Sequence, residues 1–116
     1  MTSYNRGAVI LVQFTFADES GTKQRPALVI STEAYHRSRQ EVIIAAITSQ
    51  THRLLVGDYL VKNWQSAGLL YPSVITGIIR TIHRNMITKK LGIMPTQDME
   101  AFGAALGKVL GLSHSQ

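Results

Sequence analysis

Apolar residues near the start of the chain alternate with polar ones, which is the pattern of a strand that buries one face. This pattern predicts a first strand over residues 8–16. Four even positions form its expected core face: Ile10, Val12, Phe14 and Phe16. A polar connection over residues 17–24, with a Ser-Gly turn signal, leads to a second strand headed by Arg25. We expect the two strands to form a hairpin with a long loop.

The middle of the chain contains more short apolar runs. Residues 41–47 are apolar and β-branched almost throughout, which is typical of a strand buried on both faces. Further strands are predicted over residues 54–61, where Gly57 and Asp58 interrupt the run, over residues 74–79 and over residues 81–87. The sheet should therefore contain five to seven short strands.

Helical signals are strongest near the C-terminus. Pro95 followed by Thr96 predicts a helix with Thr96 as its N-cap, and Gly111 predicts its end. Its apolar stripe, which we expect to pack on the sheet as core, consists of Met99, Phe102, Leu106, Val109 and Leu110. Residues 32–39 suit either a short helix or a solvated turn, and residues 63–68 suit a short turn or helix.

These elements indicate one α+β domain, mostly β, over residues 1–116. The chain has no internal repeat, low-complexity tract or linker, and 116 residues are enough to bury a core. Short strands in this number favour a curled sheet that carries one C-terminal helix.

The composition narrows the class of protein. Hydrophobic residues make up 45% of the chain, charged residues 16%, and mean hydropathy is +0.06, as in an ordinary globular domain. The absence of cysteine excludes disulfides, cysteine zinc sites and thiol nucleophiles. No signal region opens the chain and no apolar run approaches the ~20 residues that cross a bilayer. We therefore expect a cytoplasmic protein without membrane contact.

The charge favours a polyanionic partner. Twelve Lys and Arg against seven Asp and Glu give a net charge of +5 and a pI near 9.9. Nucleic acid is the leading partner class and an acidic protein is the second. The alternative is that this charge only keeps a small domain in solution.

Known motifs are mostly missing. The four histidines lack metal-ligand spacing, and the chain has no nucleophile elbow, phosphate-binding loop or dinucleotide fingerprint. We expect no metal and no cofactor.

Arginine, threonine and polar loops remain as the candidates for a functional site. Pro26 biases Arg25 towards extended backbone, so Arg25 is held at the rim of the sheet unless it is only an exposed strand start. A second polar cluster, residues 48–53, ends the strand at residues 41–47.

Short distinctive blocks run along nearly the whole chain. In chain order they are Arg6-Gly7, Val9-Ile10-Leu11-Val12 with Phe14 and Phe16, Ser20-Gly21, Arg25-Pro26-Ala27-Leu28-Val29-Ile30-Ser31, Ile47-Thr48-Ser49-Gln50, Ala67-Gly68-Leu69 with Pro72-Ser73-Val74, and Leu91-Gly92. Together these blocks resemble the MazF/PemK family of toxin endoribonucleases. The resemblance implies an SH3-like barrel with added helices, a homodimer, a cognate antitoxin, and metal-independent cleavage of single-stranded RNA.

The resemblance also implies a catalytic pair, Arg25 and Thr48, and products with 2′,3′-cyclic phosphate and 5′-OH ends. A guanidinium suits phosphoryl oxygens, and a threonine hydroxyl adds a second donor. His52 is a possible helper in proton transfer, and Glu19 is a weaker one. Residues expected to bind RNA are Lys23, Ser49, Gln50, His52, Arg53 and Arg80.

The sequence departs from the family pattern at two places. Ala8 stands where many relatives have Asp, and Ile75-Thr76-Gly77 stands where many carry a charged residue. A basic stretch just beyond could supply the phosphate contacts instead: Arg80, His83, Arg84, Lys89 and Lys90. The alternative is that these residues only form a solvated basic rim. The alternative function is a non-catalytic binding module of the same fold, either an RNA binder or a gyrase binder like CcdB. The pair of Arg25 and Thr48 distinguishes the two functions, because a protein that only binds gyrase does not need these catalytic side chains.

Overall fold

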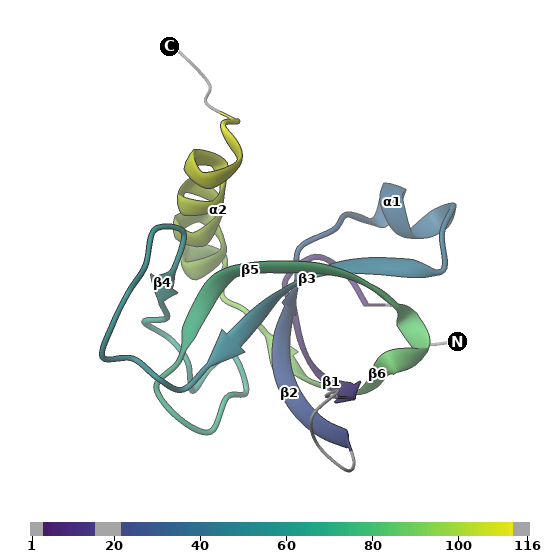
Figure 1. The fold of residues 1–116 in the computed structure, drawn as a ribbon, viewed down its shortest axis with the longest axis horizontal. Coiled ribbons are helices and arrows are strands. Elements are labelled where there is room, and N and C mark those ends of the chain that lie inside the picture. Colours follow the sequence, from purple (N-terminus) through teal and green to yellow (C-terminus); the bar gives the residue numbers. More distant parts are fainter. Residues whose placement is uncertain (1–3, 16–21, 113–116) are drawn as a thin grey trace.

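The computed structural model describes residues 4–15 and 22–112 (Figure 1). Its elements are β1 (Ala8–Thr15), β2 (Thr22–Val29), α1 (Glu33–Arg37), β3 (Glu41–Thr48), β4 (Tyr59–Leu60), β5 (Val74–His83), the 3-10 turn η1 (Arg84–Met86), β6 (Ile87–Ile93) and α2 (Thr96–Leu110). The sequence placed Lys23 and Gln24 in the first connection, but β2 already begins at Thr22. The Ser20-Gly21 turn signal and Phe16 lie outside the described residues.

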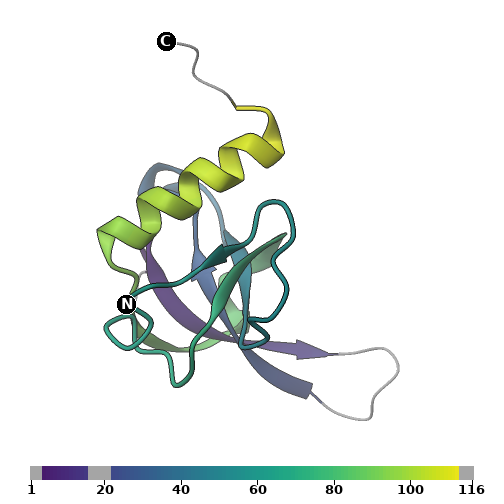
Figure 2. The same ribbon diagram turned by 90° about the vertical axis from the view of Figure 1, so that its left-hand side faces the viewer.

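The six strands form one antiparallel sheet in the order β4-β5-β3-β2-β1-β6. The sheet is strongly curled, and α2 lies across it (Figures 1 and 2). No ladder joins β4 to β6 within the described residues, so the sheet is not closed. The mostly β, α+β class with a C-terminal helix is confirmed, and so is the hairpin of β1 and β2.

Both faces of the sheet are buried where it curls. A first core, which includes Val9, Ile47 and Phe102 of α2, fills one face. A second core, which includes Ile10 and Val12, fills the other. The predicted core face of β1 is therefore right at Ile10 and Val12, but its opposite face is buried too because α2 covers Val9. Burial of β3 on both faces is confirmed.

Local signals misplaced several element boundaries. Residues 74–83 form one continuous strand, β5, because its pairing with β3 runs on through Arg80 and Thr81. Of the interrupted strand predicted over residues 54–61, only Tyr59–Leu60 forms a strand, β4. Residues 54–58 form a turn, in which the Asp58 carboxylate accepts the backbone N–H groups of Leu55 (2.9 Å) and Gly77 (3.0 Å). Of the two alternatives left open for residues 32–39, a short helix or a solvated turn, the helix is present as α1, and Thr32 is its N-cap.

The C-terminal helix is present with two differences. Pro95 is the N-cap, without a side-chain bond, and Thr96 is the first helical residue. Phe102 is fully buried, but Val109 and Leu110 are 43% and 55% exposed, so the far end of the predicted stripe is not core. The last turn runs beyond the sheet that the first turns cover (Figure 2).

The loop before β5, residues 61–73, packs directly on β6 and covers the gap between the two edges of the curled sheet. A Cβ on Gly68 would lie 2.3 Å from the Leu91 carbonyl oxygen, and one on Gly92 would lie 2.4 Å from that of Ala67. These two glycines let the backbones meet where side chains would hold them apart. Gly68 also has φ +87°, a conformation that L side chains rarely adopt. The fold thus resembles a barrel that is closed by a loop contact.

The same loop is anchored at its start by a buried carboxylate. Asp98 of α2 is fully buried and accepts hydrogen bonds from the Tyr59 hydroxyl (2.5 Å), the Lys62 backbone N–H (2.9 Å) and the Asn63 amide (2.9 Å). Burial alone would raise the pKa of Asp98, but these hydrogen bonds outweigh it and hold the pKa below the ordinary value. Burial, together with the bond to Asp98, raises the pKa of Tyr59 to about 12.

We predict that Asp98→Asn lowers the free energy of unfolding by about 2–4 kcal/mol, because an N–H donor then faces buried donors. The folded-state pKa of Asp98 is depressed, so its stabilisation is present above the ordinary pKa of 3.8 and is lost as pH falls through the folded-state pKa. Denaturant unfolding of the parent and the variant at a series of pH values measures both effects. Glu100→Gln, at an exposed position of the same helix, is the control, and equal stability of Asp98→Asn and the parent at pH 7 would contradict the prediction.

Candidate functional site

A cavity of about 570 Å³ lies where β2 and β3 part. The β2–β3 ladder stops at Ala27 and Ala46, while β2 continues towards Thr22 and β3 continues to Thr48 (Figure 1). The cavity is lined by Leu11 of β1, Gln24, Arg25 and Pro26 of β2, Ile47, Thr48, Ser49 and Gln50 at the end of β3, Gly68, Leu69, Leu70, Tyr71 and Ser73 of the loop before β5, and Lys89 and Leu91 of β6. The cavity is lined by three consecutive residues of β2, Gln24, Arg25 and Pro26, so it runs along the edge of β2 that no longer pairs with β3.

Arg25 and Thr48 lie on opposite walls of this cavity. If the register of the β2–β3 ladder is continued two residues past its last pair, Arg25 comes opposite Thr48. Each residue is held by a strand: Arg25 pairs with Val12 of β1, and Thr48 pairs with Val74 of β5. Pro26 lies just past the end of the ladder with β3, at an open edge where a proline is tolerated. Two strands thus bring together side chains that lie far apart in sequence.

The Thr48 side chain is oriented by the turn that follows it. Its hydroxyl oxygen accepts the backbone N–H of Gln50 at 3.1 Å. A hydroxyl that accepts one bond still carries its own hydrogen, so Thr48 can donate to a group in the cavity. Ser49 and Gln50 are exposed beside it and belong to the same wall.

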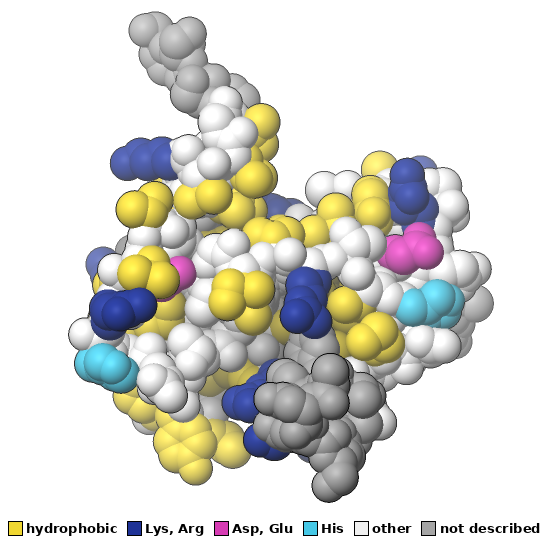
Figure 3. Space-filling view, in the orientation of Figure 1, with side chains coloured by type: hydrophobic (Ala, Val, Ile, Leu, Met, Phe, Trp, Pro, Cys, Tyr) yellow, Lys and Arg dark blue, Asp and Glu magenta, His cyan; other side chains and the backbone are white. Residues whose placement is uncertain are grey.

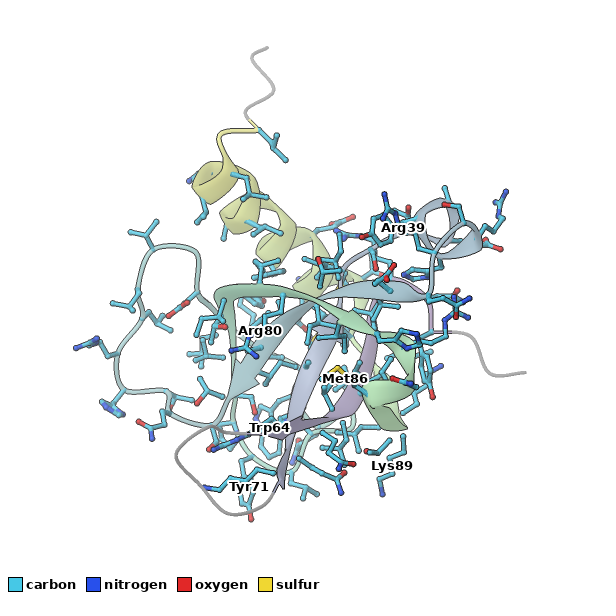
Figure 4. The ribbon with its side chains drawn as sticks, turned by 45° about the vertical axis from the view of Figure 1, so that its right-hand side comes forward. Arg39, Trp64, Tyr71, Arg80, Met86 and Lys89 are labelled. Atoms are coloured by element: carbon cyan, nitrogen blue, oxygen red, sulfur yellow. The ribbon has the colours of Figure 1, made fainter. Side chains whose placement is uncertain are left out.

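The loop before β5 supplies the apolar wall. Leu69 is buried, whereas Leu70 and Tyr71 are 81% and 64% exposed. The Ser73 hydroxyl donates to the Tyr71 carbonyl oxygen at 2.7 Å and holds the turn that presents the ring. Figure 4 shows Tyr71 and Lys89 at the same end of the molecule. An exposed aromatic ring in the same cavity as two cations, Arg25 and Lys89, suits a ligand with both flat bases and phosphates.

Sequence reasoning missed some of the residues that line this cavity. Gln24, Leu70 and Tyr71 were not singled out, although two of the family-like blocks flank the loop that carries Tyr71. From the sequence, Lys89 was singled out only as one of the basic residues from Arg80 to Lys90. In the structure, Lys89 lines the cavity. Arg84 of the same stretch instead donates to the carbonyl oxygen of His36 in α1 and to that of Arg39, two residues after the helix.

Four of the predicted RNA-binding residues do not line the cavity: Lys23, His52, Arg53 and Arg80. Lys23 lies on β2 two residues before Arg25, and His52 and Arg53 are exposed after the end of β3. Arg80 lies six residues along β5 from Val74, or about 20 Å at the usual strand rise. It is well separated from Tyr71 in Figure 4. Lys and Arg side chains lie at several separate points on the face shown in Figure 3.

Three side chains whose pKa values are shifted by their surroundings lie away from the cavity: Tyr59, Asp98 and His36. Burial, and then the nearby charge of Arg84, lowers the pKa of His36. Among the described residues, no three His, Asp or Glu side chains form a group that could hold a metal ion. None of the described helices is long and apolar enough to cross a membrane.

Comparison with known proteins identifies the relatives of the chain. Residues 5–110 match the family model of the PemK-like, MazF-like toxins of type II toxin–antitoxin systems. The sequence finds no match among curated proteins.

Solved structures share the fold at low sequence identity. An endoribonuclease in complex with its cognate antitoxin, from a mycobacterial species, matches with TM-score 0.79 and 21% identity over 97% of this chain and 100% of its own. MazF in a MazE–MazF complex from Deinococcus radiodurans matches with TM-score 0.78 and 21% identity over 95% and 97% of the two chains. The Mycobacterium tuberculosis toxin MazF-mt6 matches with TM-score 0.75 and 23% identity over 92% and 99%. At these identities the structural matches establish the fold.

Proposed function

The chain belongs to the PemK-like, MazF-like toxins of type II toxin–antitoxin systems, and from that premise we propose that it is a metal-independent endoribonuclease that cleaves single-stranded RNA. The observation that carries the proposal is that Arg25 and Thr48 line one cavity from two strands. The similar mycobacterial protein is itself described as an endoribonuclease. An exposed Tyr71 in the same cavity favours a strand whose bases are unpaired, since only those can stack on a side chain.

The proposed reaction is transesterification by the RNA itself. The 2′-oxygen loses its proton and attacks the adjacent phosphorus, the bond from phosphorus to the 5′-oxygen breaks, and the 5′-oxygen gains a proton. The products are a 2′,3′-cyclic phosphate and a 5′-OH. Negative charge grows on the phosphoryl oxygens during the attack, so donors that are already in place there lower the barrier most.

In this mechanism Arg25 and Thr48 are the two donors. The planar guanidinium of Arg25 contacts two phosphoryl oxygens, and the Thr48 hydroxyl donates to the same group. Family resemblance also assigns Arg25 a part in proton transfer. A guanidinium stays protonated in water, so its main role here is to stabilise charge. Lys89 and Ser49 bind flanking parts of the RNA at the cavity, and Lys23, His52, Arg53 and Arg80 bind its phosphates further out.

We predict that Arg25→Ala slows RNA cleavage by roughly 10² or more while weakening RNA binding far less, because the contact strengthens mainly in the transition state. Arg25→Lys restores only part of the rate, since an ammonium lacks the two-pronged contact. Thr48→Val should slow cleavage in the same way, and Thr48→Ser should keep much of the rate. Single-turnover cleavage of a labelled RNA in EDTA measures each rate.

Matched variants control for indirect effects on folding. Arg37→Ala removes an exposed arginine of α1, and Thr81→Val removes an exposed hydroxyl of β5; both should cleave like the parent. All variants are compared after their unfolding curves match that of the parent. A folded Arg25→Ala protein that cleaves as fast as the parent, or a parent that cleaves nothing in EDTA, would overturn the nuclease proposal in favour of a non-catalytic binder.

We predict that RNA affinity falls steeply with salt, because phosphate contacts release counterions. Lys89→Gln should lower the slope of log affinity against log salt by about 0.7, the single-strand value for one contact. Lys108→Gln, on the exposed side of α2, should leave the slope unchanged. Fluorescence anisotropy with an uncleavable RNA gives the slopes. Equal slopes for the parent and Lys89→Gln would remove Lys89 from the binding site.

Two protein partners are part of the proposal: a second copy of the chain and a cognate antitoxin with an acidic segment that covers the basic surface. The similar structures that contain an antitoxin support the second partner. In sedimentation at micromolar concentration, the protein alone should have twice the 12.8 kDa mass of one chain, and addition of the antitoxin should give a heavier complex. A species with the mass of one chain would contradict the dimer.

A further inference from the structure

We propose that Gln24 reads the edge of one unpaired base in the cavity, and that Thr88 is the positioning residue that decides which end of the Gln24 amide faces that base. The inference rests on the proposed function and adds a source of sequence preference to it. Gln24 is exposed on β2 and lines the cavity next to Arg25. A base bound there would lie in the same cavity as the phosphate proposed to contact Arg25.

One hydrogen bond fixes the Gln24 amide. The Thr88 hydroxyl of β6 lies 2.8 Å from the Gln24 Oε1 atom and 3.3 Å from the Leu11 carbonyl oxygen. A hydroxyl has a single hydrogen to donate, and both neighbours are acceptors, so the shorter contact is the donated one. With Oε1 engaged by Thr88, the two N–H donors of Gln24 form the end of the amide that a ligand can meet.

A β-bulge puts Thr88 in position for this bond. Leu11 of β1 pairs with Lys89, whereas Val12 pairs with Ile87, so Thr88 is the extra residue between two ladder pairs. Bulges re-aim side chains, and this one directs the Thr88 hydroxyl across β1 towards Gln24 of β2. The bulge also sets Lys89 opposite Leu11, where both residues line the cavity.

The donor end of an amide selects bases by their exocyclic groups. Uracil and guanine carry a carbonyl oxygen where cytosine and adenine carry an amino group. The fixed amide of Gln24 therefore favours uracil or guanine over cytosine or adenine at its position. A single hydrogen bond of this kind gives a preference of about fivefold to tenfold.

The test uses two random-sequence RNA pools, one cleavable and one fully 2′-O-methylated that cannot be cleaved. Sequencing of the cut ends and of the bound fraction gives the base preference at each position. The parent should prefer uracil or guanine at one position, and Gln24→Ala should abolish that preference alone. Gln24→Glu, which replaces the donors with an acceptor oxygen, should reverse it towards cytosine and adenine.

Variants of Thr88 test its positioning role. Thr88→Val frees the amide to rotate and should reduce the preference at that position to below about twofold, while Thr88→Ser should keep it. Thr81→Val and Gln65→Ala, at exposed positions that do not line the cavity, are the matched controls and should keep the parent preference. A merely structural role of Thr88 would lower stability and rate without changing the base ratio.

The outcomes separate this inference from the proposed function. If the parent cleaves and Gln24→Ala keeps every base preference, the inference is wrong and the nuclease stands. If the parent binds the methylated pool but cuts nothing, the nuclease proposal is wrong, and the bound sequences still decide the role of Gln24. A parent that neither binds nor cuts RNA overturns both.

Discussion

The carboxylate of Asp98 is the constraint on which the candidate site depends. It is buried in the first turn of α2, and its three hydrogen bonds fasten residues 59–63 to that helix. The same segment then runs to Gly68, whose backbone meets β6. The loop is thus held at its start and again near its middle, and no strand pairing among the described residues joins β4 to β6. Without these two attachments the cavity would lose the wall that carries Tyr71, although Arg25 and Thr48 would keep their strands.

Rigid elements hold the groups proposed for chemistry, while a packed loop carries the apolar surface. Arg25 and Thr48 are fixed by ladders with β1 and β5 on either side of the point where β2 and β3 part. This arrangement suits a reaction in which donors must be in place before charge develops. The loop contributes contact area, which in the proposed reaction would affect binding more than the rate of the chemical step.

Much of the fold follows from local sequence patterns, and much of the site does not. Alternation and β-branched runs predicted β1 and β3, and capping residues with a 3.6 period predicted α2. Arg25 and Thr48 could be singled out because each stands in a distinctive block. Tyr71 and Lys89 join them only through the contact of Gly68 with β6, which links parts of the chain that local reasoning treats separately. Likewise, pairing with β3 overrode the break expected within β5.

Charge and shape therefore have separate tasks in this molecule. The described lining of the cavity includes two cations, Arg25 and Lys89. The chain has a net charge of +5, and Lys and Arg side chains lie at separate points of the face shown in Figure 3. Distributed charge attracts any polyanion and carries no sequence information. Selectivity must then come from the few groups whose orientation is fixed inside the cavity. In the proposed scheme Thr88 fixes the Gln24 amide through a β-bulge, so a change of one residue on β6 would alter which base is accepted and leave the general attraction for polyanions intact.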